Sequence, residues 1–392
     1  MLDVVIVDAA RTPIGSLNGC LASVPATQLG SIAAADALRR ARVLPAQVDE
    51  TIIGNVLSAG LGQAPARQVA IGAKVPVTAG ALTVNKVCGS GMMATIVAAN
   101  RIQAGEAETV LVGGMESMSR APYLLDRARG GYRLGHAQLL DSMILDGLWD
   151  ANTQRSMGLC GELCAEKYGF TREAQDDYAA ESYTRALAAQ AAGQFAAEIV
   201  PVQVPGRAGR TETVAEDEEP KRGDLVKMRN LKPAFKEGGT VTAGNAPSVN
   251  DGAAALVVTS ARRAEMLGLK PLVRIAGMAG AATEPEWFTV APIEAMRKLF
   301  KKTGWFADSV ELFEINEAFS AVTMAAIQEL ALDPGRVNVK GGSVALGHPI
   351  GASGARILVT LLYAMSERGA RRGVAAICLG GGEALALAVE RC

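Results

Sequence analysis

The chain of 392 residues contains only two histidines, His136 and His348, and its formal net charge is −1. A sequence so poor in histidine offers few metal ligands, and we expect no bound metal. Near-neutral charge provides no long-range field for nucleic acid or an anionic membrane, so neither is a predicted partner. No uncharged apolar run reaches the roughly 18 residues of a membrane span, and the N-terminus lacks the basic segment of a signal peptide.

A closely spaced disulfide framework is also missing, since the six cysteines lie at 20, 88, 160, 164, 378 and 392. In a chain of this length that pattern is typical of a reducing compartment, and we expect a cytoplasmic protein. Cys160 and Cys164 lie four residues apart, but no second ligand pair follows them. We interpret these two cysteines as core or pocket packing.

Apolar sequence and glycine are abundant, at 49% hydrophobic residues and 43 glycines. Such a chain can bury large cores in two or three domains. Strands are expected at 4–7, 109–114, 272–275 and 374–378, and helices after Gly91 and after Gly354. Because the two ends of the chain look alike, we predict an internal duplication. The alternation of strands and helices favours parallel pairing with helices on the sheet faces.

Cys88 lies between an expected strand, 83–87, and an expected helix that starts at Gly89-Ser90-Gly91. A thiol at a helix start faces free N–H groups and the positive end of the helix dipole, which both lower its pKa. The small residues after it leave room for a substrate. A cysteine alone is more often inert core, so the interpretation of Cys88 as a nucleophile depends on partners.

Two further segments supply such partners. His348 stands in a glycine-rich stretch, 341–356, where Pro349 shapes a loop without an apolar packing face, and histidine is the natural base for a cysteine. Cys378 ends an apolar strand, and three glycines from Gly380 follow it. Their N–H groups can hold a developing oxyanion, although this segment taken alone is better explained as a tight turn beside a buried cysteine.

Together these segments resemble the thiolase family, and so do four others, in family order across essentially the whole chain: Ala10–Gly15, Gly113–Ser119, Asn250–Ala254 and Asn316–Phe319. The resemblance implies an α/β thiolase fold with duplicated α/β halves, helices packed on mixed sheets in five layers, and an inserted loop domain. Residues 1–118, completed by about 250–269, are then the N-terminal half, and 270–392 the C-terminal half. Residues 119–249 are the loop domain, which covers the active site and binds coenzyme A.

The resemblance also implies a reaction, the reversible Claisen condensation of two acetyl-CoA to acetoacetyl-CoA and coenzyme A through an acyl-cysteine. Cys88 is the implied nucleophile, His348 its base, and Cys378 the acid/base on the methyl carbon. One oxyanion hole is assigned to His348 and a water held by Asn316, the other to the N–H groups of Cys88 and Gly380. Acyl-CoA is the implied substrate, with no permanently bound cofactor, and the protein is expected to be a homo-oligomer, a dimer of dimers.

Within the expected loop domain, Thr171 is a predicted N-cap of a helix to about Ala192. An acidic run at 216–219 precedes a basic stretch from Lys221 to Lys232. The basic residues can meet the phosphates of coenzyme A or form a solvated charged loop, and Arg222 is the predicted phosphate contact. The residues predicted to contact the coenzyme are Arg222, Ser248, Met157, Phe288, Phe319 and Ala318.

The chain departs from the family pattern at Ser156, where many short-chain thiolases carry histidine, at Pro247, where the family has serine, and at Glu383-Ala384. Phe288 falls where many short-chain thiolases place methionine at the acyl pocket, so a narrow acetyl pocket and an ordinary core position are both open. The alternatives for function are a degradative 3-ketoacyl-CoA thiolase, a decarboxylating ketoacyl synthase, and a non-catalytic acyl-CoA or lipid-binding protein of the same fold.

Overall fold

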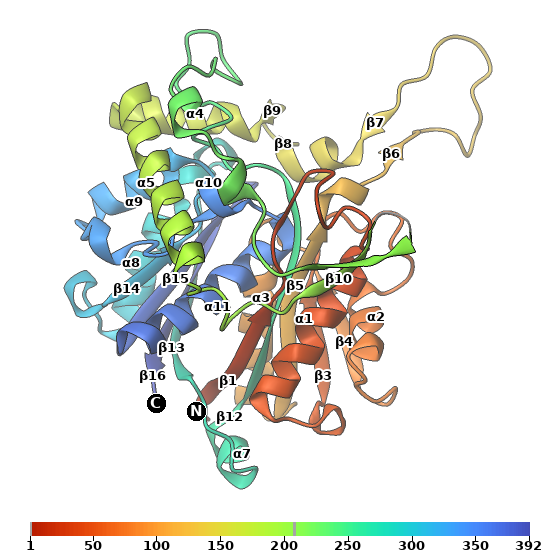
Figure 1. Ribbon diagram of the computed structural model, residues 1–392, viewed down its shortest axis with the longest axis vertical. Helices are drawn as coiled ribbons and strands as arrows, with labels where there is room; N and C mark the ends of the chain where they lie inside the picture. The colour runs from red at the N-terminus through yellow and green to blue at the C-terminus, as the bar shows by residue number, and fades with distance from the viewer. Residues whose placement is uncertain (1, 207–208) are drawn as a thin grey trace.

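A single mixed sheet of ten strands runs through this computed structural model, which describes residues 2–206 and 209–392 (Figure 1). The strand order is β14-β15-β16-β13-β1-β12-β5-β3-β4, with β2 paired to β12. The strands are β1 (Val4–Arg11), β2 (Gly15–Ser16), β3 (Glu50–Gly54), β4 (Gly80–Val84), β5 (Thr109–Ser117), β12 (Asn250–Ser260), β13 (Val273–Ala282), β14 (Leu312–Ile315), β15 (Arg372–Leu379) and β16 (Glu383–Arg391). The two halves of the chain meet at β1 and β13, which share only two residue pairs, Val5 with Arg274 and Ile6 with Val273.

The expectation of parallel pairing is right for some strands and wrong for others. β3 lies parallel to β4 and β5, and β14 lies parallel to β15. β12 is antiparallel to β1 and β5, and β16 is antiparallel to β13 and β15. β15 and β16 are joined by the short glycine turn that begins at Gly380, and so short a connection permits only an antiparallel hairpin.

Side-chain alternation along the strands builds five layers. Val110 and Val112 of β5 pack inward on α3 (Ser90–Gln103) and α11 (Ile350–Arg368), whereas Leu111 packs outward against α1 (Ala26–Ala41) and α2 (Pro65–Gly72). In the second half, Ile377 of β15 faces the same central helices, and Ala376 faces α8 (Ala291–Thr303) and α9 (Ser320–Glu329). The order of layers is therefore helices, sheet, α3 with α11, sheet, helices (Figure 1).

Two glycines let the central helices touch near their N-terminal ends. A Cβ added to Gly91 would lie 2.7 Å from the backbone nitrogen of Ala355, and one added to Gly354 would lie 2.6 Å from that of Met92. No side chain fits at such distances, so glycine permits this close approach. Because Cys88 precedes α3 and His348 precedes α11, the contact brings the two residues to the same end of the central layer.

The segment between the halves wraps over that end of the molecule (Figure 1). It contains β6 (Tyr123–Leu124), β7 (Leu140–Asp141), β8 (Trp149–Asp150), β9 (Arg155–Ser156), α4 (Met157–Tyr168), α5 (Arg172–Ala191), β10 (Val202–Pro205), β11 (Thr211–Val214) and α6 (Leu225–Met228). Thr171 caps α5 as predicted, because its hydroxyl accepts a hydrogen bond of 3.1 Å from the N–H of Ala174. Buried Arg11 of β1 binds Glu198 at 2.6 Å and Asp217 at 2.7 Å, which ties this segment to the sheet.

Two short helices complete the fold, α7 (Ala261–Met266) and α10 (Ser343–Leu346). None of the helices in the described ranges has the length and apolarity needed to cross a bilayer.

The β6–β7 hairpin projects from the body, and exposed His136 lies in its loop (Figure 1). The second histidine is therefore exposed, whereas His348 is buried.

Candidate active site

A cavity of about 350 Å³ lies where the ends of α3 and α11 meet the wrapping segment. Most of the residues predicted for the site line this cavity: Cys88, His348, Gly380, Met157, Ser248, Phe288, Ala318 and Phe319. The remainder of the wall is largely apolar, with Leu148, Trp149 and Phe235 among its side chains. A mostly apolar cavity with a few convergent polar groups is typical of a small-molecule site.

Cys88 is presented by a strained backbone. Val87, directly before it, has φ of 45°, a left-handed conformation that is costly for a β-branched residue. Burial raises the pKa of the Cys88 thiol to about 12, aided by the Glu116 carboxylate, although the backbone N–H groups of Gly380 and of Cys88 itself lower it. The expectation of a lowered pKa is therefore wrong, because desolvation outweighs the backbone donors.

His348 is buried, and its hydrogen bonds fix which nitrogen is free. Its Nδ1 lies 2.6 Å from the hydroxyl of Ser353, which donates its proton to the carbonyl of Pro349 at 2.9 Å. Nδ1 therefore carries the ring proton, and Nε2 is the basic nitrogen. Nε2 has no hydrogen-bond partner among the described residues. Burial, aided by the charge of Arg356, lowers the pKa of His348 to about 3, so the ring is neutral and can accept a proton.

Cys378 lies at the end of β15, behind the cavity wall. It packs in a hydrophobic cluster with Phe288, Ala318 and Phe319. Burial, together with the nearby charge of Cys88, raises the pKa of Cys378 well above its usual value. The two thiols are therefore neighbours, and both are protonated at neutral pH.

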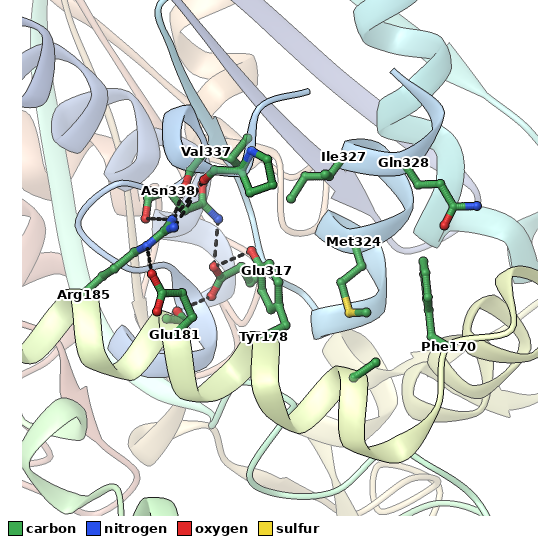
Figure 2. Close-up of a pocket in the computed structure, with 13 residues that line it drawn as sticks. Phe170, Tyr178, Glu181, Arg185, Glu317, Met324, Ile327, Gln328, Val337 and Asn338 are labelled. Carbon is green, nitrogen blue, oxygen red and sulfur yellow. Dashed lines mark hydrogen bonds and ion pairs between the residues drawn. The ribbon is translucent and has the colours of Figure 1, made fainter. Parts of the chain in front are cut away.

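Asn316 follows β14 and is fully buried. Its Oδ1 accepts a hydrogen bond of 2.6 Å from Ser343, while its Nδ2 has no partner in the described part of the chain. The carboxylate of the next residue, Glu317, accepts hydrogen bonds from Tyr178 and Asn338 (Figure 2). It also accepts from Ser182 and from the N–H of Val344. This network holds the turn that carries Asn316, and it forms one wall of a separate cavity of about 360 Å³ whose described lining has no cysteine or histidine.

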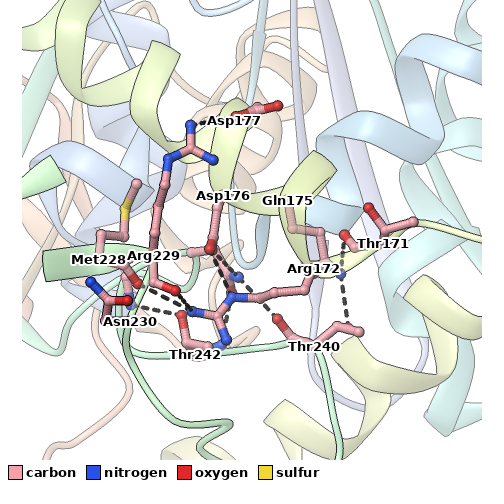
Figure 3. A network of polar contacts seen from close by, with 12 residues as sticks. Thr171, Arg172, Gln175, Asp176, Asp177, Met228, Arg229, Asn230, Thr240 and Thr242 are labelled. Atoms are coloured by element: carbon pink, nitrogen blue, oxygen red, sulfur yellow. Dashed lines mark hydrogen bonds and ion pairs between the residues drawn. The ribbon is translucent and has the colours of Figure 1, made fainter. Parts of the chain in front are cut away.

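A network of polar contacts joins α5 to segment 228–245, which carries Phe235 of the Cys88 cavity (Figure 3). Arg172 binds Asp176 at 2.8 Å and donates to the carbonyls of Met228 and Arg229. Asp176 also accepts from Asn245 at 2.8 Å. Since both ends of segment 228–245 are bound in this way, the segment holds Phe235 against the cavity.

Arg222 is not in the cavity. It lies in a neighbouring hollow beside Leu231 and Gly244, with an exposed side chain that pairs with Glu218 at 3.2 Å.

Ser156 and Pro247 both line the cavity, so two departures from the family pattern fall on its wall. The third, Glu383, forms an ion pair with Lys86, two residues before Cys88.

Sequence reasoning missed Ser353 and Glu116, although both occur in motifs that carried the resemblance. Glu116 is buried, and its carboxylate accepts from the side chain of Asn55 and from the N–H groups of Val56, Leu57 and Gly351. It thereby ties the loop after β3 to the first turn of α11. A charged residue at the end of a buried strand was the available signal, because such a group requires several donors.

Replacement of Glu116 by glutamine is expected to lower the thermal unfolding temperature by several degrees. One carboxylate oxygen would become an NH₂ group facing backbone donors, and each buried donor left unpaired costs about 1–3 kcal/mol. Calorimetry at fixed protein concentration measures the shift. An unchanged unfolding temperature would contradict this role for Glu116.

The rate at which iodoacetamide alkylates Cys88 is expected to rise about tenfold per pH unit from neutral to alkaline pH. A raised pKa leaves the thiol protonated at neutral pH, and the reactive thiolate fraction grows with each unit below the pKa. Peptide mass mapping assigns the reaction to Cys88. A rate that is constant through this range would reveal a preformed thiolate instead.

Comparison with known proteins agrees with this geometry. The family model of the thiolase N-terminal domain matches residues 4–262, and that of the thiolase C-terminal domain matches residues 269–391. The chain belongs to the thiolase family. The alternative of a ketoacyl synthase loses its support, because the second histidine that such a site needs is exposed in the β6–β7 loop.

Named thiolases cover the chain throughout. It is 54% identical over 390 residues to acetyl-CoA acetyltransferase 2 of Arabidopsis thaliana, covering 99% of this chain and 97% of that protein. It is 51% identical to the acetyl-CoA acetyltransferase of Cupriavidus necator, over 100% of both chains. The crystal structure of Acat5 thiolase from Ascaris suum in complex with coenzyme A matches with a TM-score of 0.94 at 46% identity, over 100% of both chains.

A second solved structure, the acetyl-CoA acetyltransferase of Bacillus anthracis, matches with a TM-score of 0.97 at 40% identity and covers 100% of this chain and 99% of that one. The expected fold is thus confirmed.

Cys160 and Cys164 are both buried in hydrophobic clusters, and the described residues include no group of three or more potential metal ligands.

Proposed function

We propose that this thiolase is an acetyl-CoA C-acetyltransferase that forms acetoacetyl-CoA and coenzyme A from two acetyl-CoA, reversibly. The observation that carries the proposal is the meeting of Cys88, the unpartnered Nε2 of His348 and the Gly380 backbone at one apolar cavity. The names of the relatives at 50–54% identity support the same reaction.

In the first stage, Nε2 of His348 takes the thiol proton of Cys88 as the sulfur attacks the carbonyl carbon of acetyl-CoA. The carbonyl oxygen becomes an oxyanion beside the N–H groups of Gly380 and Cys88, whose nearness to the sulfur also lowers the pKa of the thiol. The carbon–sulfur bond to coenzyme A then breaks, the leaving thiolate is protonated from solvent, and the proton taken from Cys88 stays on Nε2 of His348. The products of this stage are acetyl-Cys88 and free coenzyme A.

In the second stage, Cys378 releases its thiol proton to solvent, and the resulting thiolate takes a proton from the methyl group of a second acetyl-CoA. The carbanion attacks the acetyl carbon on Cys88, and the carbon–sulfur bond breaks to release acetoacetyl-CoA and the Cys88 thiolate, which regains its proton from Nε2 of His348. Until then the enolate oxygen is held by the protonated Nε2 of His348 and a water on the Asn316 amide, whose unpartnered Nδ2 supports this role. Each such donor is worth about 3–4 kcal/mol in the transition state.

We propose that coenzyme A enters between α4 and segment 228–248. Met157, Ala318, Phe319 and Ser248 line this part of the cavity, where apolar side chains suit the pantetheine chain. The Ser248 hydroxyl donates to Asn250 at 2.9 Å, so its oxygen is left to accept from the ligand. Arg222 is proposed to meet a phosphate outside the cavity, where its exposed guanidinium would exchange the Glu218 carboxylate for the phosphate.

Phe288 is proposed to limit acyl chain length, because its buried ring lines the cavity beside Cys378. The Phe288→Ala variant is expected to raise kcat/KM for a C8 3-ketoacyl-CoA at least about 10-fold relative to acetoacetyl-CoA, since removing the ring opens space for further methylenes. Steady-state thiolysis of both substrates measures the ratio. An unchanged ratio would mean that Phe288 is only a core residue.

We further propose a homo-oligomer, a dimer of dimers, in a reducing compartment such as the cytoplasm. β4 is an edge strand of the sheet, and partly exposed Leu82 lies on it, which favours pairing with a second copy. Exposed Leu134 and Leu139 on the projecting hairpin offer a second apolar contact. The six free cysteines favour a compartment that keeps thiols reduced. A monomeric mass by light scattering would refute the oligomer.

The test of the proposed function is thiolysis by free coenzyme A, with acetoacetyl-CoA and a C8 3-ketoacyl-CoA assayed in parallel. Turnover that strongly favours acetoacetyl-CoA supports the acetyltransferase. Equal or faster turnover of the C8 substrate would instead assign a degradative 3-ketoacyl-CoA thiolase. If neither substrate turned over, the chain would be a binding protein of the same fold.

A further inference from the structure

Arg356 is a charged residue in the central layer that the reaction steps above do not use. It lies on α11, three residues after the Ser353 that holds His348, and its side chain is 3% exposed. Its nearest carboxylate is that of Glu314 on β14, with 3.6 Å between Nη1 and Oε2. Removing both charges from water is unfavourable, so a buried pair of this kind is costly to the fold. Its place beside the site gives reason to ask what the pair does.

The guanidinium connects to Asn316 through one hydroxyl group. Nη2 of Arg356 donates to Oγ of Ser343 at 3.3 Å, and Ser343 donates to Oδ1 of Asn316 at 2.6 Å. All three side chains are buried. The contacts therefore form a continuous chain from the cation to the amide.

The donor and acceptor groups fix which side chain donates in each of these two hydrogen bonds. A guanidinium has only donors, so Ser343 must accept from Arg356, and its single proton is directed to Asn316. The amide oxygen is then occupied, and Nδ2 remains as the free donor, without a partner in the described chain. If the amide were turned over, the Ser343 proton would lose its acceptor in a buried site, which is costly.

We propose that Arg356 and Ser343 are positioning residues that fix the orientation of the Asn316 amide, so that Nδ2 points to the water and enolate oxygen. This inference rests on the proposed function. Glu314 packs beside the cation, with burial raising the pKa of this carboxyl to about 8, and Arg356 acts only through Ser343. A buried ion pair with only a structural role would have no effect on the orientation of the Asn316 amide.

A double-mutant cycle on the full-length protein tests the proposal. Ser343→Ala is expected to lower kcat for acetoacetyl-CoA thiolysis about 10-fold with KM for coenzyme A nearly unchanged, because loss of one oxyanion donor costs at most about 10²–10³. In an Asn316→Ala background, the same substitution is expected to change kcat less than about twofold, since Ser343 then has no amide to orient.

Arg356→Lys and Arg356→Met provide the conservative comparison. An ammonium group also only donates, so the lysine variant is expected to keep kcat within a few fold, whereas the methionine variant is expected to lose as much as Ser343→Ala. If Arg356→Met does not fold, the Ser343 cycle still decides the proposal, because Ser343→Ala removes one oxygen. Thr259→Val, which removes a buried hydroxyl bonded to Thr109 and the Glu108 carbonyl, is the matched control and is expected to leave kcat unchanged.

Equal losses for Ser343→Ala in both backgrounds would overturn the proposal and leave the proposed reaction intact. So would an undiminished kcat for Ser343→Ala. If the wild-type protein did not cleave acetoacetyl-CoA at all, the proposed function itself would fail, and the two failures are therefore distinguishable.

Discussion

The Cys88→Ser variant is expected to lower kcat for acetoacetyl-CoA thiolysis at least about 10³-fold, the scale seen when a covalent nucleophile is removed. A serine hydroxyl is a far weaker acid than a cysteine thiol, so His348 removes its proton far less readily. An ester on serine would also release its acyl group to coenzyme A far more slowly than a thioester. Stopped-flow measurement of acetoacetyl-CoA consumption gives the ratio.

The matched control is Cys392→Ser, at an exposed cysteine remote from the cavity, which is expected to keep full activity. Coenzyme A binding by Cys88→Ser, measured by calorimetry, is expected to remain close to wild type and to show that the site is intact. Turnover within about 10-fold of wild type would contradict the assignment of Cys88 as the nucleophile.

The Cys378→Ser variant is expected to separate the two stages. Exchange of labelled coenzyme A into acetyl-CoA needs only Cys88 and His348, so it is expected to stay within about 10-fold of wild type. Carbon–carbon bond formation needs a group that takes a methyl proton, and a serine hydroxyl is a poor one, so condensation is expected to fall about 10³-fold or more. Radiolabel exchange and coupled detection of acetoacetyl-CoA measure the two rates on one preparation.

Cys160→Ser is the control for that split, because Cys160 is a second buried cysteine of the same hydrophobic cluster. It is expected to affect both reactions equally and mildly. If Cys378→Ser lost exchange and condensation to the same extent, the loss would be one of site integrity, and Cys378 would not be the acid/base of the second stage.

The residues that could be placed from sequence are those whose surroundings are local in the chain. Cys88 before α3, His348 before α11 and the Thr171 cap of α5 each follow from neighbours within a few positions. The five layers were expected only from the family resemblance, as was the loop domain at residues 119–249, which stays a prediction. Strand direction within the sheet was only partly predictable, because β12 reaches its neighbours from the wrapping segment rather than through a crossover helix.

Other properties depend on atoms far apart in the chain. The pKa of Cys88 is set by burial and Glu116, which no local pattern reveals, and the local argument gave the wrong sign. The free nitrogen of His348 is known only once Ser353 is seen to donate to Pro349. Arg222 was chosen from a basic stretch, yet its side chain lies outside the cavity, because composition does not specify which way a loop turns.

Rapid quenching after mixing with acetyl-CoA, followed by peptide mass mapping, tests the central claim most directly. The predicted result is an acetyl group on Cys88 alone, formed no more slowly than turnover and removed when coenzyme A is added. An acetyl group on a different cysteine, or turnover of acetoacetyl-CoA without any covalent adduct, would contradict the acyl-Cys88 mechanism.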